Sequence, residues 1–310
     1  MSRAALRQVA PVVETTVLDA YISGLAPSGR RGITSLLNRS ASILKRGADA
    51  ASYPWEQLSF AAVAKVRAAL LDDGYAVSSV NMALSALRGI AQTAFNLNCL
   101  EADTLARIRA VKRVNGDNQR KGRALSREEV RALVQAAKQH PQRIRCCRDV
   151  AIVMTLCGAG LRAGELVSLE CRDYDNGILT VRQGKGRKYR EIHVAATVDK
   201  AIRAWIKDSG VKDTGDALFN RIQRNGRVVR HALTTTGLTG ILAQLQQDAG
   251  IARFTPHDMR RTFITRLLEQ GVDINTVRQL AGHSDISTTT RYDHREEGMK
   301  MNASRHIRCW

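Results

Sequence analysis

Hydrophobic residues in the first third of the chain repeat with the spacing of amphipathic helices. Apolar side chains recur every three or four positions in four stretches, at about residues 17–25, 33–43, 63–71 and 80–90. Side chains at that spacing share one face of an α-helix, and an apolar face packs into a core. None of these stretches alternates apolar and polar residues as a half-buried strand does. The pattern predicts a small helical bundle over about residues 14–111.

The second half begins with a helix and then combines helices with a hairpin. Ser126 followed by Glu129 is a capping-box pattern, which predicts a helix that runs to about Lys138. Residues 177–183 and 189–194 have the composition of two short strands joined by a Gly-Lys-Gly turn. Further helices are predicted over about residues 143–157, 198–207 and 236–247, and from residues 255, 274 and 286. The chain is therefore expected to be mostly α with a small β-sheet.

A polar and basic segment separates the two halves. Residues 112–123 contain five Lys or Arg residues against one Asp, together with Gly, Asn and Gln. This composition is typical of a linker. A solvated linker is one interpretation, and a charged strap that crosses a phosphate backbone between two domains is the other. We predict a first domain over residues 1–111, a linker over 112–125, and a second domain with a C-terminal tail over 126–310.

The net charge indicates the kind of partner. The 310 residues include 48 Lys and Arg against 29 Asp and Glu, a formal charge of +19. Such an excess favours DNA, RNA or an anionic membrane surface, although charge alone also fits a merely basic protein. The sequence shows neither an apolar run of the ~18 residues that a membrane span needs nor a signal-peptide pattern. We therefore expect a cytoplasmic protein that binds nucleic acid and does not bind a membrane.

The cysteines do not predict a metal site. The six cysteines show no CxxC spacing and no paired histidines. A zinc module is therefore not expected, and the thiols are expected to be reduced.

Two clusters in the second half place cationic side chains at turns. Glycines deliver Arg162 to the start of a helix, and Glu165 lies three positions on, on the same face, where it can hold the guanidinium. Gly184 and Gly186 flank Lys185 at the tip of the hairpin, where an ammonium group can act as a general acid. Each cluster also has an ordinary interpretation: an exposed ion pair on a helix, and a basic turn that contacts phosphates passively.

Two further clusters add imidazole, guanidinium and phenol groups. His257 and Arg260 lie three apart in the first turns of a helix that a Thr-Pro pair opens, so both point to one side, at an end that favours anions. Gly282 ends another helix and leaves His283 in a turn, nine residues before Tyr292. An HxxR pair can arise by chance, and a single tyrosine is usually a packing residue. Together, however, the four clusters can hold, polarise and attack a phosphodiester without a metal ion.

The motifs in this order resemble the tyrosine recombinase, or phage-integrase-type, family. The R-x-x-E pair, GKG turn, HxxR pair, Gly-His pair and tyrosine follow the family's order at compatible spacings over residues 126–293. Residues 80–88 look like part of its core-binding domain. The resemblance implies that residues 1–111 form a helical core-binding domain and residues 126–310 an α+β catalytic domain, which together clamp DNA. One small departure is Ala281, where many relatives carry Leu, with no consequence expected for the chemistry.

The resemblance also implies roles for individual residues. Arg162 and Arg260 would clamp the scissile phosphate, and Tyr292 would attack it to form a 3′-phosphotyrosine. Glu165 stands where the family often has an acidic residue that supports the first arginine.

The remaining site residues would handle protons and bind DNA. Lys185 would protonate the 5′-oxygen leaving group. His257 would assist proton transfer from the tyrosine, and His283 would donate a hydrogen bond to a nonbridging oxygen. The basic side chains expected to contact DNA are Arg88, Lys112, Arg113, Arg120, Lys121, Arg123, Arg187 and Lys188.

The function implied by the resemblance is site-specific recombination or integration of double-stranded DNA, without metal, ATP or another cofactor. A bacterial, phage or other mobile-element origin is expected, with a dimer on each site, a homotetramer on DNA and a monomer when free. Two alternatives are a type IB-like topoisomerase and a catalytically idle DNA-binding protein. The sequence leaves open the target site, the direction of the reaction, any accessory proteins, and whether the tail packs on its own protomer.

Overall fold

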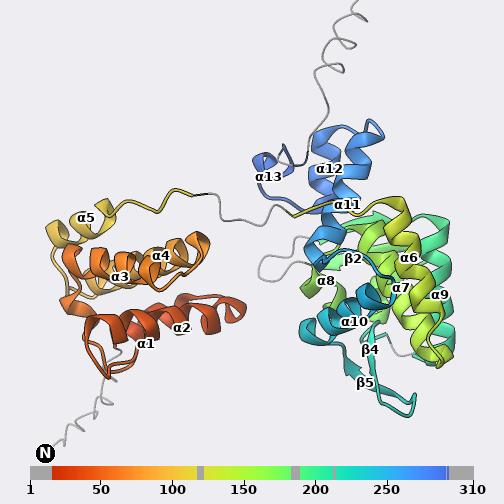
Figure 1. Ribbon diagram of the computed structural model, residues 1–310, viewed down its shortest axis with the longest axis horizontal. Helices are drawn as coiled ribbons and strands as arrows, with labels where there is room; N and C mark the ends of the chain where they lie inside the picture. Colours follow the sequence, from red (N-terminus) through yellow and green to blue (C-terminus); the bar gives the residue numbers. More distant parts are fainter. Residues whose placement is uncertain (1–15, 117–121, 183–188, 212–213, 291, 293–310) are drawn as a thin grey trace, which may run out of the picture. The chain divides into compact units, whose positions relative to one another are not determined.

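The computed structural model describes residues 16–116, 122–182, 189–211, 214–290 and 292. The chain divides into two compact units, Met1–Arg120 and Lys121–Trp310, each with its own buried core (Figure 1). Helices dominate both units, and the strands of the described residues lie in the second. The predicted mostly α fold with a small β component is confirmed. None of the helices in these described ranges has the length and apolar character of a membrane span.

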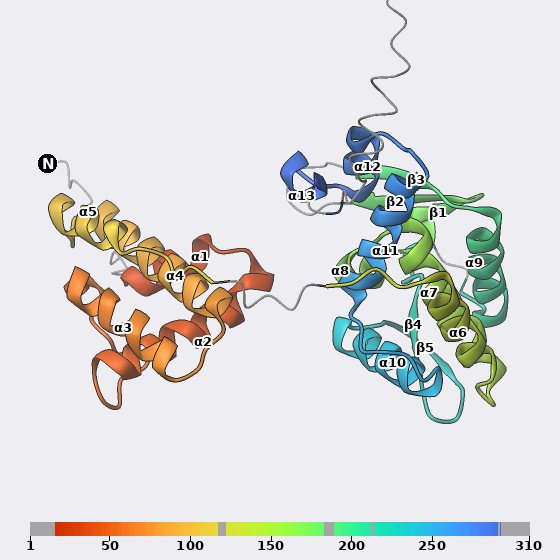
Figure 2. The same ribbon diagram turned by 45° about the horizontal axis from the view of Figure 1, so that its top comes forward.

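The first unit is a helical bundle centred on one helix. Its described elements are α1 (Val17–Gly24), α2 (Pro27–Leu44), the 3-10 turn η1 (Trp55–Gln57), α3 (Phe60–Asp72), α4 (Val77–Asn96) and α5 (Ala102–Ala110). Helix α4 packs against α1, α2, α3 and α5 (Figure 2). The predicted apolar stripes supply the core, since Val63, Val66, Leu84 and Leu87 are fully buried.

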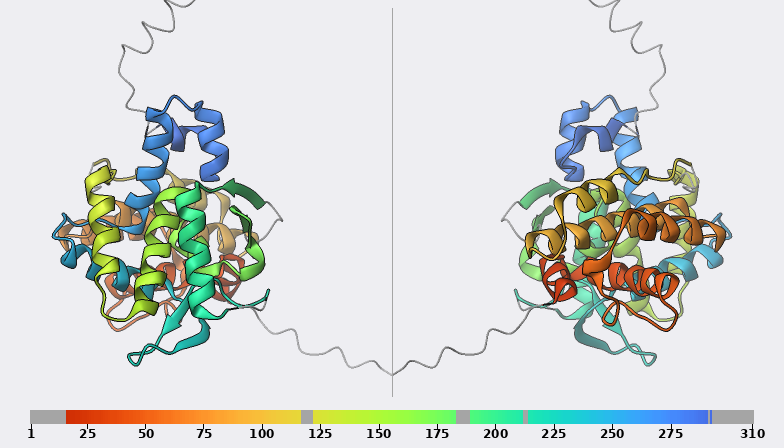
Figure 3. Two further views of the ribbon diagram at one scale, coloured as in Figure 1. Left: turned by 90° about the vertical axis from the view of Figure 1, so that its right-hand side faces the viewer. Right: turned by 90° about the vertical axis from the view of Figure 1, so that its left-hand side faces the viewer.

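The second unit is built around helix α7. Its described helices are α6 (Arg127–Lys138), α7 (Arg143–Ala159), α8 (Ala163–Ser168), the 3-10 turn η2 (Cys171–Asp173), α9 (Ala196–Ser209), α10 (Thr235–Asp248), α11 (Pro256–Glu269), α12 (Ile274–Ala281) and α13 (Ile286–Thr290). Helix α7 packs against α6, α9 and α11, and the left view of Figure 3 shows α6, α7 and α9 side by side. The capping box predicted at Ser126 and Glu129 is present at the start of α6.

Two small antiparallel sheets complete this unit. Strands β1 (Tyr174–Asp175), β2 (Ile178–Arg182) and β3 (Tyr189–His193) form one sheet, and β4 (Asn220–Ile222) and β5 (Val228–Ala232) form a hairpin. The predicted hairpin is β2–β3, and its turn, with Lys185, lies outside the described residues. The β4–β5 hairpin and β1 were not predicted, because strands of two to five residues with exposed positions carry little periodic signal.

Two glycines shape the turns that carry candidate site residues. Gly160 ends α7 with a φ of 60°, and Gly282 ends α12 with a φ of 65°. These left-handed conformations favour glycine, which has no β-carbon to clash. At Gly160 a β-carbon would also lie 2.3 Å from Cδ1 of Phe263 on α11, so the close approach of α11 to this turn requires glycine. The turns place Arg162 and His283 immediately after the ends of their helices.

Candidate active site

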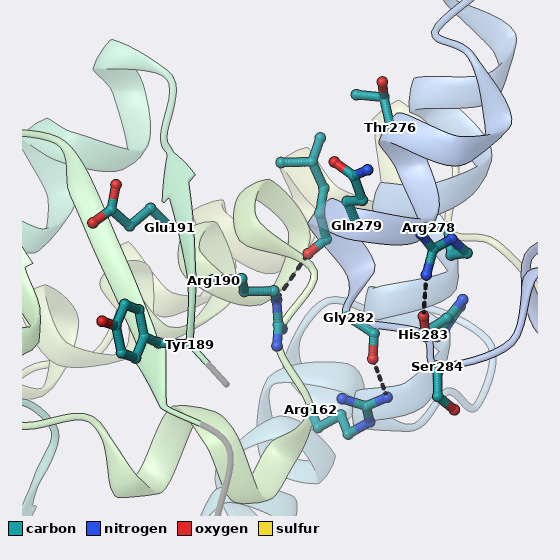
Figure 4. A pocket seen from close by; sticks show the side chains of 11 residues that line it. Arg162, Tyr189, Arg190, Glu191, Thr276, Arg278, Gln279, Gly282, His283 and Ser284 are labelled. Atoms are coloured by element: carbon teal, nitrogen blue, oxygen red, sulfur yellow. Dashed lines mark hydrogen bonds between the residues drawn. The ribbon is translucent and has the colours of Figure 1, made fainter. Parts of the chain in front are cut away.

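Three arginines converge on the carboxyl end of α12. The successive carbonyl groups of residues 280–282 accept hydrogen bonds from Arg190, Arg260 and Arg162, respectively (the first and last are drawn in Figure 4). The Arg190 Nε–O distance is 2.9 Å and the Arg162 Nη2–O distance is 3.1 Å. The last carbonyl groups of a helix lack intrahelical donors and carry partial negative charge. The arginines therefore satisfy these groups and fix the turn that presents His283.

Glu165 lies between these arginines. Its carboxylate accepts hydrogen bonds from Nη1 of Arg162 at 2.7 Å and from Nη1 and Nη2 of Arg190 at 3.2 and 2.8 Å. Nη1 of Arg260 lies 3.9 Å from the same carboxylate. Burial raises the pKa of Glu165, but the hydrogen bonds and charges of Arg190 and Arg162 outweigh burial and lower the pKa to about 2. One negative charge is thus shared among three positive charges, which leaves a net positive cluster.

The two candidate clamp arginines differ in exposure. The side chain of Arg162 is 45% exposed and lines an open pocket of about 760 Å³ together with Arg190 and His283 (Figure 4). Arg260 is only 1% exposed, and its Nη1 donates to the carbonyl oxygen of Gly160 at 2.8 Å. Burial and the charge of Arg162 lower the pKa of Arg260 to about 10, so its guanidinium remains protonated at neutral pH. In this structure Arg162 is accessible to an anion, whereas Arg260 donates hydrogen bonds that hold the turn after α12.

Tyr292 and His257 meet through their polar atoms. The Tyr292 hydroxyl lies 3.2 Å from Nε2 of His257. Tyr292 is buried and lies just beyond the end of α13. His257 is exposed, yet partial desolvation and the charges of Arg260 and Arg261 lower its pKa. A neutral imidazole with its hydrogen on Nδ1 can accept the phenol proton through Nε2.

His283 is held by backbone and side-chain contacts. Its backbone N–H donates to the carbonyl oxygen of Arg278 at 3.0 Å, and its Nδ1 lies 2.9 Å from Oγ1 of Thr289. Burial and the charges of Arg260 and other nearby arginines lower the pKa of His283 to about 4, so the imidazole is neutral at pH 7. When the Thr289 hydroxyl donates to Nδ1, the ring hydrogen lies on Nε2, which can then donate to an anion. The ring stacks on Tyr292 with centroids 6.1 Å apart.

The structure thus brings together most of the residues that the motifs single out. Those gathered around this end of α12 are Arg162, Glu165, His257, Arg260, His283 and Tyr292. Lys185, Arg120, Lys121, Arg187 and Lys188 lie outside the described residues.

The described basic residues expected to bind DNA have different surroundings. Lys112 and Arg113 are exposed. Arg88 donates to the carbonyl oxygen of Val111 within the first unit. Arg123 donates to Glu129 at 2.7 Å and to a backbone carbonyl at 2.8 Å within the second unit. Contact of these four side chains with DNA stays a prediction. Lys112 and Arg113 are the most accessible of the four.

Sequence reasoning missed Arg190, Thr289 and Arg261. A signal for Arg190 was present, because it lies two residues before the buried Ile192 on strand β3 and therefore shares its inward face. An inward arginine requires an anionic or carbonyl partner. No comparable signal marks Thr289, on the five-residue α13, or Arg261, within α11.

Comparison with known proteins agrees with this geometry. The sequence profile described as "Phage integrase family" matches residues 123–299, more than half of the chain. Tyrosine recombinase XerA of Thermococcus kodakarensis is 34% identical over 225 residues, which cover 72% of this chain and 73% of that protein. Tyrosine recombinase XerD of Oceanobacillus iheyensis is 30% identical over 247 residues, which cover 77% of this chain and 79% of that protein.

Solved structures show the same fold. The Tn1549 transposon integrase in complex with circular intermediate DNA superposes with a TM-score of 0.67, at 21% identity, over 94% of this chain and 100% of that one. A lambda integrase dimer bound to a COC′ core site gives a TM-score of 0.64 at 17% identity. The match covers 90% of this chain and 77% of that one. The chain therefore belongs to the phage integrase family. Within that family it is a tyrosine-type site-specific DNA recombinase, and neither the topoisomerase nor the idle-protein alternative is favoured.

Proposed function

We propose that this recombinase cuts and rejoins double-stranded DNA through a 3′-phosphotyrosine formed on Tyr292. The observation that carries the proposal is the 3.2 Å contact between the Tyr292 hydroxyl and Nε2 of His257, beside an arginine cluster with net positive charge. A phenol next to a neutral base is a nucleophile ready to lose its proton. An adjacent guanidinium cluster suits the negative charge that grows on a pentacoordinate phosphorus.

In the proposed first step the Tyr292 oxygen forms a bond to phosphorus and the bond to the 5′-oxygen breaks. His257 accepts the phenol proton through Nε2. Arg162 and His283 donate hydrogen bonds to the nonbridging oxygens. Arg260 also donates to these oxygens when the bound phosphate contacts its guanidinium. Lys185, which lies outside the described residues, would supply the proton that the 5′-oxygen takes up.

The proposed second step reverses the first with a different strand. A 5′-hydroxyl, whose proton would pass to Lys185, attacks the phosphotyrosine, and the phenol oxygen leaves and takes back its proton from His257. The protein–DNA ester conserves the energy of the broken bond, so rejoining needs no ATP. The charge stabilisation that a metal ion could supply comes from the guanidinium and imidazole groups.

The proposed assembly places two protomers on each DNA site and four during exchange. Solved relatives include a lambda integrase dimer bound to a core site and a lambda integrase tetramer bound to a Holliday junction. We propose that residues 1–111 act as the core-binding domain, and that the linker at residues 112–125 allows both units of one protomer to clamp the duplex.

Trapping of the covalent complex tests the proposed chemistry. The DNA site can first be selected from a random pool by binding, and then nicked close to the cleavage position so that a short fragment is lost after cleavage. We expect the wild-type protein to form an adduct that survives denaturing electrophoresis, with the DNA attached to the peptide that contains Tyr292 in mass spectrometry. An adduct on another residue, or a cleaved strand without an adduct, would contradict the proposal.

The clamp predicts a steep dependence of DNA affinity on salt. The logarithm of the binding constant should fall with the logarithm of salt concentration by ~0.9 for each phosphate neutralised. Replacing the exposed Lys112 and Arg113 by Ala should therefore reduce the slope by about two. Arg107→Ala is the matched control, because Arg107 is exposed and already paired with Asp103 at 2.8 Å. Titrations by fluorescence anisotropy measure the slope, and an affinity that barely changes with salt would rule out the clamp.

The contact between Thr289 and His283 predicts a smaller effect on cleavage. Thr289→Val keeps the shape of the side chain but removes the hydroxyl that fixes the imidazole with its hydrogen on Nε2. A neutral hydrogen bond contributes ~1 kcal/mol, so we expect single-turnover cleavage to slow roughly fivefold to tenfold. Thr290→Val is the control, since Thr290 is exposed and bonds only to a backbone carbonyl of its own turn among the contacts described. Equal cleavage rates for the two variants would show that Thr289 does not set the imidazole.

A further inference from the structure

Arg261 lies directly on the proposed nucleophile. Its guanidinium carbon is 4.7 Å from the centre of the Tyr292 ring. Arg261 follows Arg260 on α11, but the two side chains contact different partners: Arg260 serves the carbonyl groups of residues 160 and 281. A cation above an aromatic face is attracted by the electron density of the ring, and more strongly where water is partly excluded. The Tyr292 ring is 5% exposed, so this contact is largely desolvated.

The polypeptide that enters the second unit confines this guanidinium. A β-carbon on Gly122 would lie 3.1 Å from Nε and 3.3 Å from Nη2 of Arg261, and 2.6 Å from Oδ1 of Asp258. The same Asp258 oxygen accepts the backbone N–H of Arg123 at 3.0 Å, which fixes the segment in this position. Gly122 thus packs closely against Arg261, and a larger residue would displace the guanidinium or the segment itself.

The hydrogen bonds of Arg261 do not explain its position. Its Nε is buried and has no hydrogen-bond partner among the described residues. An unpaired buried donor is costly unless another interaction compensates it. The contact with the Tyr292 ring is the favourable interaction that the structure shows for this side chain. The arrangement therefore favours a role for Arg261 at the phenol.

We propose that Arg261 is a positioning residue for strand cleavage, which holds the Tyr292 ring by a cation–π contact so that the hydroxyl stays on Nε2 of His257. This inference rests on the proposed role of Tyr292 as the nucleophile. The hydroxyl also lies 3.2 Å from Nε2 of His257, and the imidazole of His283 lies nearly parallel to the ring. The ring in addition belongs to an apolar cluster with Phe263 and Ile264. Without Arg261 the ring keeps its apolar neighbours but loses the cation on its face, so the hydroxyl is held less firmly against the base.

A second consequence follows from the charge of Arg261. Desolvation is the largest cause of the lowered pKa of His257, and the charges of Arg260, Arg261 and Arg162 lower it further. The charge of Asp258 acts in the opposite direction, and the Tyr292 hydroxyl faces Nε2 of the ring. Removing the Arg261 charge raises the pKa of His257. Since the base must be neutral to accept a proton, the acid limb of the cleavage rate should then move to higher pH. A purely structural role for Arg261 would not move this limb.

Single-turnover cleavage of the nicked DNA, measured against pH at saturating protein, tests the inference. We expect Arg261→Gln to form the Tyr292 adduct roughly tenfold more slowly than wild type, with the acid limb displaced upward. Arg261→Lys keeps a cation near the ring and should stay within about threefold of wild type with an unchanged acid limb. Gly122→Ala, which crowds Arg261 without changing any charge, should also slow cleavage. Arg253→Gln, an exposed arginine just before α11, is the control and should match wild type.

The outcomes separate this inference from the proposed function. In the first outcome, wild-type protein forms an adduct on Tyr292, and the Arg261→Gln variant cleaves at an equal or faster rate with an unchanged acid limb. This result overturns the role of Arg261 and leaves the proposed function intact. Wild-type protein that forms an adduct elsewhere, or none, overturns the proposed function and the inference with it. DNA affinity and thermal denaturation of each variant show whether the fold is kept, and Arg261→Lys provides the comparison if Arg261→Gln is unstable.

Discussion

Replacing Tyr292 by phenylalanine should abolish the covalent protein–DNA complex and leave DNA affinity close to that of wild type. The change removes one oxygen, which is the atom proposed to attack phosphorus. Loss of a nucleophile typically lowers the rate by far more than ~10³-fold. The hydroxyl contacts His257 at 3.2 Å, and a net contribution of ~1 kcal/mol for such a hydrogen bond is too small to threaten the fold. Denaturing electrophoresis of the nicked-DNA reaction measures the adduct, and anisotropy measures the affinity.

Tyr189→Phe is the matched control for this experiment. Tyr189 lies on strand β3 and lines the pocket beside Arg162 and His283, where it is 69% exposed. We expect this variant to form the adduct at the wild-type rate. Adduct formation by the Tyr292→Phe protein would mean that another side chain attacks the phosphate, and the catalytic assignment would fail.

The second large effect concerns Arg162 and Arg260, the two arginines proposed to clamp the phosphate. They should have similar effects on catalysis and different effects on stability. Arg162→Ala and Arg260→Ala should each slow cleavage by ~10²–10³-fold, because each removes a fixed donor from the charge on phosphorus. Arg162 is half exposed, and Arg190 continues to pair with Glu165 after its removal, so the stability should change by about 1 kcal/mol or less. Single-turnover cleavage measures the shared loss of rate.

Arg260→Ala should in addition destabilise the protein. Its guanidinium is 1% exposed and bonds to the carbonyl groups of residues 160 and 281. Each buried acceptor left without a donor costs ~1–3 kcal/mol, and the lost side chain also leaves a cavity. We expect a clear fall in the thermal midpoint of Arg260→Ala and little change for Arg162→Ala. Equal midpoints would show that Arg260 does not hold the turn, whereas unchanged cleavage would remove the arginines from the phosphate site.

Arg190 is a second ion-pair partner of Glu165 and changes the charge balance of the site. From the motif alone Glu165 supports Arg162, but in the structure Glu165 makes its bidentate contact with Arg190. Arg190 therefore balances much of the carboxylate charge, although Nη1 of Arg162 also donates to Glu165 at 2.7 Å. Without Arg190, the carboxylate would draw more strongly on Arg162 and lower the positive charge that faces the pocket.

Much of this recombinase can be predicted from sequence because its decisive signals are local. Capping residues start α6 and α11, glycine ends α7 and α12, and apolar stripes mark the faces of α3 and α4. The caps and the terminal glycines act over four residues or fewer, where backbone geometry dictates which side chains suit a position. The order and spacing of the Arg, His and Tyr motifs then suffice to identify the family and its chemistry.

Only the tertiary structure decided which side chains support the chemistry. Arg190 reaches a carbonyl group 90 residues away in the chain, and Arg260 reaches one 100 residues away. Helical or strand periodicity shows which face a side chain occupies, but it does not show which distant element that face will meet. The burial of Arg260, the shared carboxylate of Glu165 and the contact of Arg261 with Tyr292 all depend on such meetings, so they became visible only when α8, β3, α11 and α12 were packed together.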